Sequence, residues 1–147
     1  MSYVLDTNVI VYAFDDRTPL KREICRRLFE HALAIRQAVP RQVLGELLAG
    51  AHRRKHIPLT SARMVVGLIE TGVPVLPTLP HLTLAASETA ERYQMQYFDA
   101  LICRIALESG ASHVISEDMH DGLVIDGLRI INPFAPANAA LLEALTS

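Results

Sequence analysis

The sequence predicts an α/β domain in which a parallel sheet carries helices on both faces. Short apolar runs typical of strands alternate with segments whose apolar residues recur at helical spacing. This alternation is the pattern of βαβ units, which build a parallel sheet covered by helices. The 147 residues fit one domain of ordinary size, and no linker, repeat or low-complexity tract interrupts them. We therefore predict a single domain over residues 1–147.

Five apolar runs are candidate strands, and together they predict a parallel sheet of about five strands. They span residues 3–5, 38–40, 73–76, 113–116 and 128–131. Helical patterns occupy residues 9–14, 41–53, 60–70, 87–93, 99–108 and 137–145, with a longer helix opening at Pro19. Proline suits the first turn of a helix, and Gly72 and Gly110 suit helix ends.

The composition predicts a folded protein of the cytoplasm. Half of the residues are hydrophobic and 20% are charged, which excludes disordered, collagen-like and disulfide-rich chains. No apolar run approaches the ~20 residues of a membrane helix, and the first residues lack the basic stretch of a signal peptide. Cys25 and Cys103 lie far apart in apolar helical surroundings, as expected for buried thiols in a reducing compartment.

The two halves of the chain carry opposite net charge. Residues 1–63 contain 11 Lys and Arg against 6 Asp and Glu, whereas residues 64–147 contain 3 against 10. A basic half beside an acidic half suits a polyanionic partner near a cation-binding site. Helices with differently charged solvent faces give the same imbalance, so the charge pattern alone leaves both interpretations open.

Two aspartates lie just beyond the ends of candidate strands. Asp6 ends the run at residues 3–5, and Asp118 comes just after the run at residues 113–116. Ligands of an open parallel sheet bind beyond the carboxyl ends of its strands, so both carboxylates belong to the edge where a site is expected. Asp6 is equally well placed to cap the helix that follows it, and position alone would make Asp118 an ordinary loop residue.

Two further acids stand in apolar helical surroundings. A lone carboxylate such as that of Glu46 is costly to bury without a partner or a cation, unless the residue falls on a solvent-facing stripe. Asp99 begins the helical pattern at residues 99–108, where a helix cap is the local expectation. Asp121 is a possible fifth acid or a turn residue, and the turn is favoured.

Together these positions predict three or four carboxylates converging at one edge of the sheet. Two like charges about 4 Å apart repel by about 4 kcal/mol at an effective dielectric constant of 20, so such a cluster requires a cation or bound protons. Carboxylate ligands without His or Cys favour a hard ion, Mg²⁺ or Mn²⁺. Such ions activate water and stabilise charge on a phosphodiester, and the basic half would then hold a nucleic-acid backbone.

Four short motifs occur in order along the chain. They are VLDTN at residues 4–8, VLGEL at 43–47, YFDALI at 97–102 and VISEDM at 114–119, followed by IINPF at 130–134. In these motifs the sequence resembles a PIN-domain ribonuclease, most closely the toxin subunits of VapBC-type toxin–antitoxin pairs. The resemblance covers nearly the whole chain and implies a PIN-like fold, a five-stranded parallel sheet flanked by helices.

The resemblance also implies a site, a reaction and partners. The implied catalytic ligands of one or two Mg²⁺ or Mn²⁺ ions are Asp6, Glu46, Asp99 and Asp118. The residues that would orient these carboxylates by hydrogen bonds are Thr7, Asn8 and Ser116. The implied reaction is hydrolysis of an RNA phosphodiester by metal-activated water, with tRNA or ribosomal RNA as the substrate. The implied protein partners are an antitoxin and a second copy of the chain in a homodimer.

Arg53, Arg54 and Lys55 form the densest basic cluster and are possible RNA contacts, although such a run is usually a solvated face. Two alternatives to a toxin stay open, namely a catalytically silent PIN domain that binds RNA and a housekeeping RNA-processing nuclease. A silent module usually lacks one or more of the acids, and all four are present here. The intact set favours an enzyme, a metal-dependent endoribonuclease.

Overall fold

The computed structural model describes residues 1–54 and 57–147 of the chain. The strands are β1 (Tyr3–Leu5), β2 (Val39–Pro40), β3 (Val75–Leu76), β4 (His113–Ile115), β5 (Val124–Ile125) and β6 (Leu128–Ile131). The helices are α1 (Thr7–Tyr12), α2 (Pro19–Ala34), α3 (Arg41–Arg54), α4 (Leu59–Gly72), α5 (Leu82–Tyr93), α6 (Tyr97–Glu108) and α7 (Ala139–Leu145), with a 3₁₀ helix, η1 (Pro136–Asn138), before α7. Every helix that the sequence predicts is present.

The five predicted strands are present, but they are shared between two sheets. The main sheet has the order β1-β4-β6-β5, in which β1, β4 and β6 are parallel. β2 and β3 pair in parallel as a separate sheet. Each of these two strands is only two residues long, and Pro40 has no backbone N–H to donate to a further ladder. The α/β class with a mostly parallel central sheet is thereby confirmed.

The apolar pattern does not predict β5. This strand pairs antiparallel with β6 through a two-residue turn at Asp126 and Gly127, whose φ angles are 48° and 91°. Positive φ at both central positions is the hairpin geometry that an Asp-Gly pair favours. The main sheet is therefore mixed, with one antiparallel strand at its edge.

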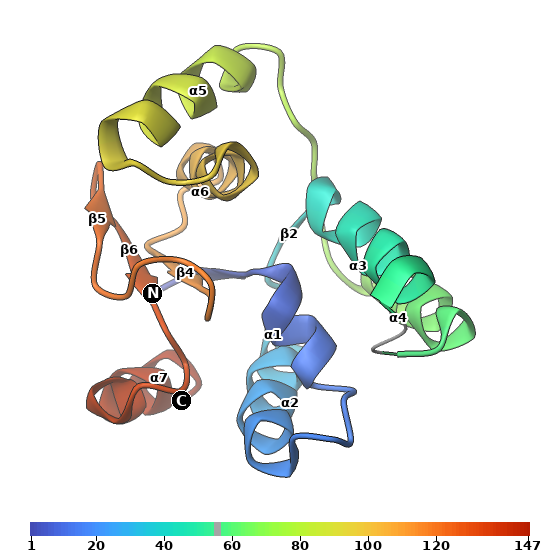
Figure 1. Cartoon of the computed structure of the whole chain (residues 1–147). Helices are drawn as coiled ribbons and strands as arrows, with labels where there is room; N and C mark the ends of the chain where they lie inside the picture. Colours follow the sequence, from blue (N-terminus) through green and yellow to red (C-terminus); the bar gives the residue numbers. More distant parts are fainter. Residues whose placement is uncertain (55–56) are drawn as a thin grey trace.

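Helices cover both faces of the main sheet. In Figure 1, α5 and α6 lie above the strands, α1, α2 and α7 lie below them, and α3 and α4 lie to the right. Val4, Val114 and Ile130 in the parallel strands are completely buried, as expected where both faces of a sheet are covered. Cys25 and Cys103 are buried free thiols. No helix within the described ranges is long and apolar enough to span a membrane.

The parallel pairing of β1 with β4 sets the edge at which the acidic residues gather. Leu5 lies opposite Ile115 in the register, so the two strands end at the same level. The hydrogen bonding continues one step further, because Asp6 N donates to Ile115 O (3.0 Å) and Ser116 N donates to Ile131 O (2.9 Å). Asp6 and Ser116 therefore leave adjacent strands side by side at the carboxyl edge of the sheet.

Candidate active site

Asp6 lies where β1 ends and α1 begins. Its Oδ1 accepts a hydrogen bond from the backbone N–H of Thr7 (2.7 Å), so Asp6 is the N-cap of α1. Its Oδ2 accepts from Ser116 Oγ (2.7 Å) and from Asn8 Nδ2 (3.1 Å). Only 4% of the residue is exposed. Asp6 thus caps the helix with one oxygen while the other joins the network at the end of β4.

Glu46 reaches from α3 toward the start of α1. Its Oε2 accepts from Thr7 Oγ1 (2.8 Å), and its Oε1 accepts from the side-chain amide of Gln42, one turn earlier on α3. Gln42 Nε2 also donates to the carbonyl oxygen of Phe98 (3.2 Å), which ties α3 to the first turn of α6. Glu46 is half-buried and both of its oxygens are engaged, so it does not belong to a solvent-facing stripe.

Asp99 lies in the first turn of α6. The N-cap of this helix is Gln96, so Asp99 does not have the capping role that its position in the sequence favours. Asp99 is half-buried, and Coulombic repulsion acts on it from Glu46 and Asp118. The hydrogen bond from Gln42 holds the turn that carries Asp99 against α3.

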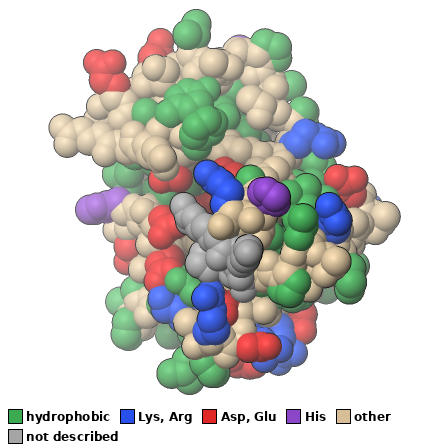
Figure 2. Space-filling model, turned by 45° about the vertical axis from the view of Figure 1, so that its right-hand side comes forward, with side chains coloured by type: hydrophobic (Ala, Val, Ile, Leu, Met, Phe, Trp, Pro, Cys, Tyr) green, Lys and Arg blue, Asp and Glu red, His purple; other side chains and the backbone are tan. Residues whose placement is uncertain are grey.

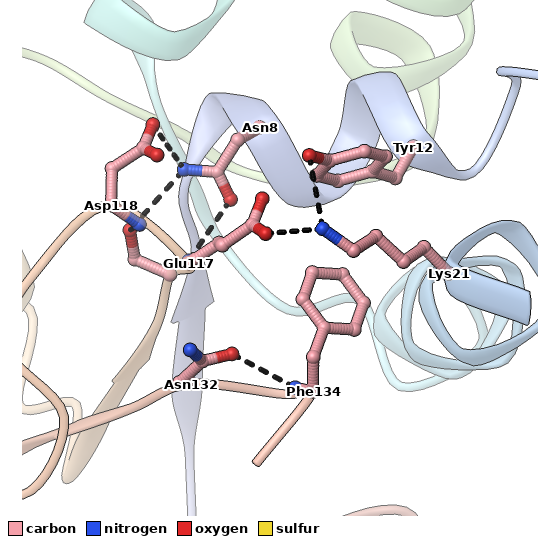
Figure 3. A network of polar contacts seen from close by, with 8 residues as sticks. Asn8, Tyr12, Lys21, Glu117, Asp118, Asn132 and Phe134 are labelled. Atoms are coloured by element: carbon pink, nitrogen blue, oxygen red, sulfur yellow. Dashed lines mark hydrogen bonds and ion pairs between the residues drawn. The ribbon is translucent and has the colours of Figure 1, made fainter. Parts of the chain in front are cut away.

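The side-chain amide of Asn8 joins the ends of β1 and β4 (Figure 3). Its Nδ2 donates to Asp118 Oδ2 (3.2 Å) and Ser116 Oγ (3.2 Å) as well as to Asp6. Its Oδ1 accepts from the backbone N–H of Glu117 (3.2 Å). These partners determine the orientation of the amide, because a carboxylate only accepts and a backbone N–H only donates. Asn8 thereby connects the exposed Asp118 to the buried Asp6.

Burial and mutual repulsion raise two pKa values at this edge. The pKa of Asp6 rises from 3.8 to about 6, chiefly through burial, with repulsion from Asp99 and Glu46 adding to it and hydrogen bonds opposing it. The pKa of Asp99 also rises from 3.8 to about 6, through burial and then through repulsion from Asp118 and Glu46. These interactions link all four acids, so the structure brings Asp6, Glu46, Asp99 and Asp118 together.

The chemistry of this donor set suits a hard divalent cation. Within residues 1–54 and 57–147, no group of three or more Asp, Glu, His or Cys side chains is already arranged to hold a metal ion. Several carboxylate oxygens instead accept hydrogen bonds from Thr7, Asn8 and Ser116. A cation between the carboxylates would offset both the burial of their charge and their mutual repulsion, which together raise the pKa values of Asp6 and Asp99. Oxygen ligands of this kind therefore fit Mg²⁺ or Mn²⁺.

Asp121 has different partners from the four acids. Its Oδ1 accepts from the backbone N–H of Asn132 (2.8 Å) and from Asn138 Nδ2 (2.9 Å). Asp121 is not among the residues whose charge raises the pKa of Asp6 or Asp99. Its hydrogen bonds join the loop after β4 to the segment that leads into α7. These contacts fit a turn residue rather than a fifth acid of the cluster.

The basic cluster lies at the far end of α3. Arg53 is exposed and follows Glu46 by seven residues, which places it on the same face of the helix, about 10 Å further along the axis. Arg54 is the last residue of α3, and Lys55 lies outside the residues that the structure describes. Figure 2 shows Lys and Arg on this side of the molecule interspersed with Asp and Glu rather than gathered in one stripe.

Two contacts of the site are absent from the sequence prediction. Gln42 precedes Glu46 by four residues, a spacing at which helical side chains meet, so this partner could have been found. Glu117 accepts from Lys21 Nζ, and these residues are 96 positions apart. No local pattern signals an ion pair of that separation.

A comparison with known protein families matches residues 3–120 to the PIN domain. The chain belongs to the PIN domain family. The matched part of this PIN domain includes all four acidic residues at the carboxyl edge of the sheet. No curated protein matches the sequence.

Several solved structures share the fold of this PIN domain. One is a chain of a toxin–antitoxin complex from Klebsiella pneumoniae, with 18% identity, a TM-score of 0.65, and coverage of 90% of this chain and 98% of that chain. VapBC2 from Rickettsia felis, bound to a DNA fragment from its promoter, gives 20% identity, a TM-score of 0.62 and coverage of 90% and 98%. The sarcin–ricin loop cleaving toxin VapC20 from Mycobacterium tuberculosis gives 20%, 0.57, and coverage of 77% and 87%. At these identities the likeness establishes a common fold.

The raised pKa values predict how the stability of the metal-free PIN domain depends on pH. Asp6 and Asp99 hold protons more tightly when folded than when unfolded, so their contribution to stability is complete below about pH 4 and is lost as the pH rises through about 6. Asp99→Asn removes one of these charges. We therefore expect this variant to unfold at higher temperature than the wild type in EDTA at pH 7.5.

The expected gain is about 1 kcal/mol, since one pKa unit corresponds to about 1.4 kcal/mol and solvent screens the half-exposed Asp99. The measurement is thermal unfolding in EDTA at pH 5 and pH 7.5, with Asp16→Asn, an exposed acid before α2, as the matched control. The gain should shrink at pH 5 and be absent from the control. Equal melting temperatures of wild type and Asp99→Asn at pH 7.5 would contradict an unfavourable charge on Asp99 in the folded protein.

The orientation of Asn8 predicts that a carboxylate is unfavourable at this position. Asn8→Asp replaces the Nδ2 donor with an oxygen that faces Asp6 Oδ2 and Asp118 Oδ2. We expect a loss of about 1–3 kcal/mol in the metal-free protein, measured by urea unfolding at pH 7.5. Asn8→Ala removes the same donor without adding charge, so it should cost less. A variant Asn8→Asp as stable as Asn8→Ala would show that repulsion plays no part.

Proposed function

We propose that this PIN domain is a Mg²⁺- or Mn²⁺-dependent endoribonuclease and the toxin of a VapBC-type toxin–antitoxin pair. Four carboxylates from separate parts of the chain meet at one edge of the sheet, and this arrangement supports the proposal. Mutual repulsion and shared hydrogen-bond donors link these carboxylates into one acidic cluster. Clustered carboxylates with raised pKa values are typical of sites that bind a cation or carry out catalysis.

The ligands of one or two divalent ions would be Asp6, Glu46, Asp99 and Asp118. When bound, the ions supply an activated water molecule and stabilise charge on the phosphodiester. The chain supplies rigidity, because Asp6 and Ser116 continue paired strands and Thr7 holds the carboxylate of Glu46. Donors that orient ligating carboxylates in this way commonly change metal affinity or activity by 10–100-fold when removed.

The toxin assignment extends the fold likeness to a biological role. Two chains that share the fold come from a toxin–antitoxin complex and from VapBC2, and a third is described as a sarcin–ricin loop cleaving toxin. By this analogy the substrate is tRNA or ribosomal RNA, and the partners are a cognate antitoxin and a second copy of the chain. We take residues 1–147 as one domain acting in the cytoplasm, where RNA is at hand and buried thiols stay reduced.

The test of the activity is cleavage of total tRNA and ribosomal RNA by purified protein in Mn²⁺. We expect discrete products that are absent in EDTA and absent with Asp99→Asn. Asp16→Asn, which alters an acid outside the cluster, should cleave like the wild type. Cleavage that persists in both EDTA and Asp99→Asn would contradict the proposal.

The test of the toxin role is growth after expression in a bacterial host. The wild type should arrest growth, Asp6→Asn should not, and co-expression of the antitoxin should restore growth. Cleavage without growth arrest would favour a housekeeping nuclease. Binding of RNA without cleavage by the wild type would favour the silent module.

The basic end of α3 is proposed to contact the RNA backbone. Arg53→Ala should lower the slope of log Kd against log salt concentration by about 1, as expected for the loss of one phosphate contact. RNA binding is measured in EDTA so that no cleavage occurs. Arg129→Ala is the matched control. Arg129 is exposed on β6 opposite His113, the first residue of β4, and so lies toward the end of the strands away from the acidic cluster. An unchanged slope in Arg53→Ala would remove Arg53 from the RNA interface.

A further inference from the structure

A lysine held between two aromatic rings lies beside the candidate site (Figure 3). Lys21 Nζ, on α2, is 4.9 Å from the ring centroid of Tyr12 and 4.7 Å from that of Phe134. The two rings meet edge to face, with centroids 5.4 Å apart and an interplanar angle of 88°. Both distances lie within the range at which a cation is attracted to an aromatic face. The cage therefore restricts where the ammonium group can lie.

Glu117 is the anionic partner of this lysine. Lys21 Nζ donates to Glu117 Oε1, and the two side chains are 36% and 25% exposed. The backbone N–H of Glu117 donates to Asn8 Oδ1 (3.2 Å). Glu117 is thus fastened through its side chain to α2 and through its backbone to α1, as Figure 3 shows. The residue that follows it is Asp118.

Asp118 differs from the other acids in how it is held. Asp6 is buried and Glu46 is half-buried, whereas Asp118 is exposed on the loop after β4. Its carboxylate accepts from Asn8 Nδ2, and its backbone N–H donates to Ser116 Oγ. Because burial does not restrain this carboxylate, its position depends on the anchoring of the loop that carries it.

We propose that Lys21 is a positioning residue for Asp118, acting through its ion pair with Glu117. The aromatic cage holds the ammonium group, the ammonium group holds Glu117, and Glu117 keeps the loop where Asp118 meets the other acids. The inference rests on the proposed function, since it assigns Lys21 to the same metal site. A direct contact of Lys21 with RNA phosphate is the competing role, and the experiment below separates the two.

The variants remove the ion pair from either side. Lys21→Met keeps the length of the chain and loses the charge, while Glu117→Gln leaves the lysine in place and loses its partner. Lys21→Arg retains the cation and should restore wild-type behaviour. The matched control is Arg104→Met, which removes an ion pair between α6 and Asp126 (2.7 Å) in the hairpin turn.

Two measurements are made in the absence of RNA. Amide hydrogen exchange of the metal-free protein reports on the loop, and Glu117 and Asp118 should exchange several-fold faster in Lys21→Met and Glu117→Gln than in the wild type. Titration with Mn²⁺ reports on the site, and the dissociation constant should rise about tenfold in the same two variants. Arg104→Met and Lys21→Arg should match the wild type in both measurements.

The outcomes separate the possible failures. Loop exchange at the wild-type rate in Lys21→Met would overturn the positioning role. Weaker RNA binding in Lys21→Met, with wild-type loop exchange and Mn²⁺ affinity in Glu117→Gln, would also overturn it and make Lys21 an RNA contact. Faster loop exchange in a protein whose wild type binds no Mn²⁺ would support the anchoring of Asp118 and overturn the proposed function instead.

Discussion

Asp6 and Ser116 leave neighbouring strands at the same level because β1 and β4 pair in parallel, and the other contacts of the site are built on that step. The 2.7 Å hydrogen bond between Ser116 Oγ and Asp6 Oδ2 closes the gap between the two strand ends. Asn8 then extends the connection to Asp118, and Thr7 extends it to Glu46 on α3. The site therefore takes its rigidity from the sheet, in which Val4, Val114 and Ile130 of the parallel strands are completely buried.

The same arrangement is electrostatically unfavourable without a cation. Burial and like charge together raise the pKa values of Asp6 and Asp99 to about 6. At neutral pH both carboxylates are nevertheless mostly ionised, and this charge lowers the stability of the metal-free fold. Neutral donors offset part of this cost at the individual oxygens. A bound ion explains the presence of these carboxylates better than packing does. An apolar residue would fill the same space without the electrostatic cost of burying like charges.

The sequence predicts the α/β class, five of the six strands and the candidate role of the four acids, because apolar runs and carboxylates in apolar surroundings are local signals. It does not predict that β2 and β3 form their own sheet, since pairing depends on tertiary placement. The β5–β6 hairpin was predictable in principle, because Asp126 and Gly127 are a hairpin-turn pair between apolar residues. The ion pair of Lys21 with Glu117 was not, because only the folded chain brings α2 to the end of β4.

Crystals soaked in Mn²⁺ would show whether the carboxyl edge of β1 and β4 binds a divalent cation. The anomalous scattering of manganese locates the ion independently of activity, RNA or partner. We expect an anomalous peak among Asp6, Glu46, Asp99 and Asp118 in the wild type, and a weaker or absent peak in crystals of Asp99→Asn. Manganese bound only elsewhere, or not bound at all, would show that this edge of the sheet is not a metal site.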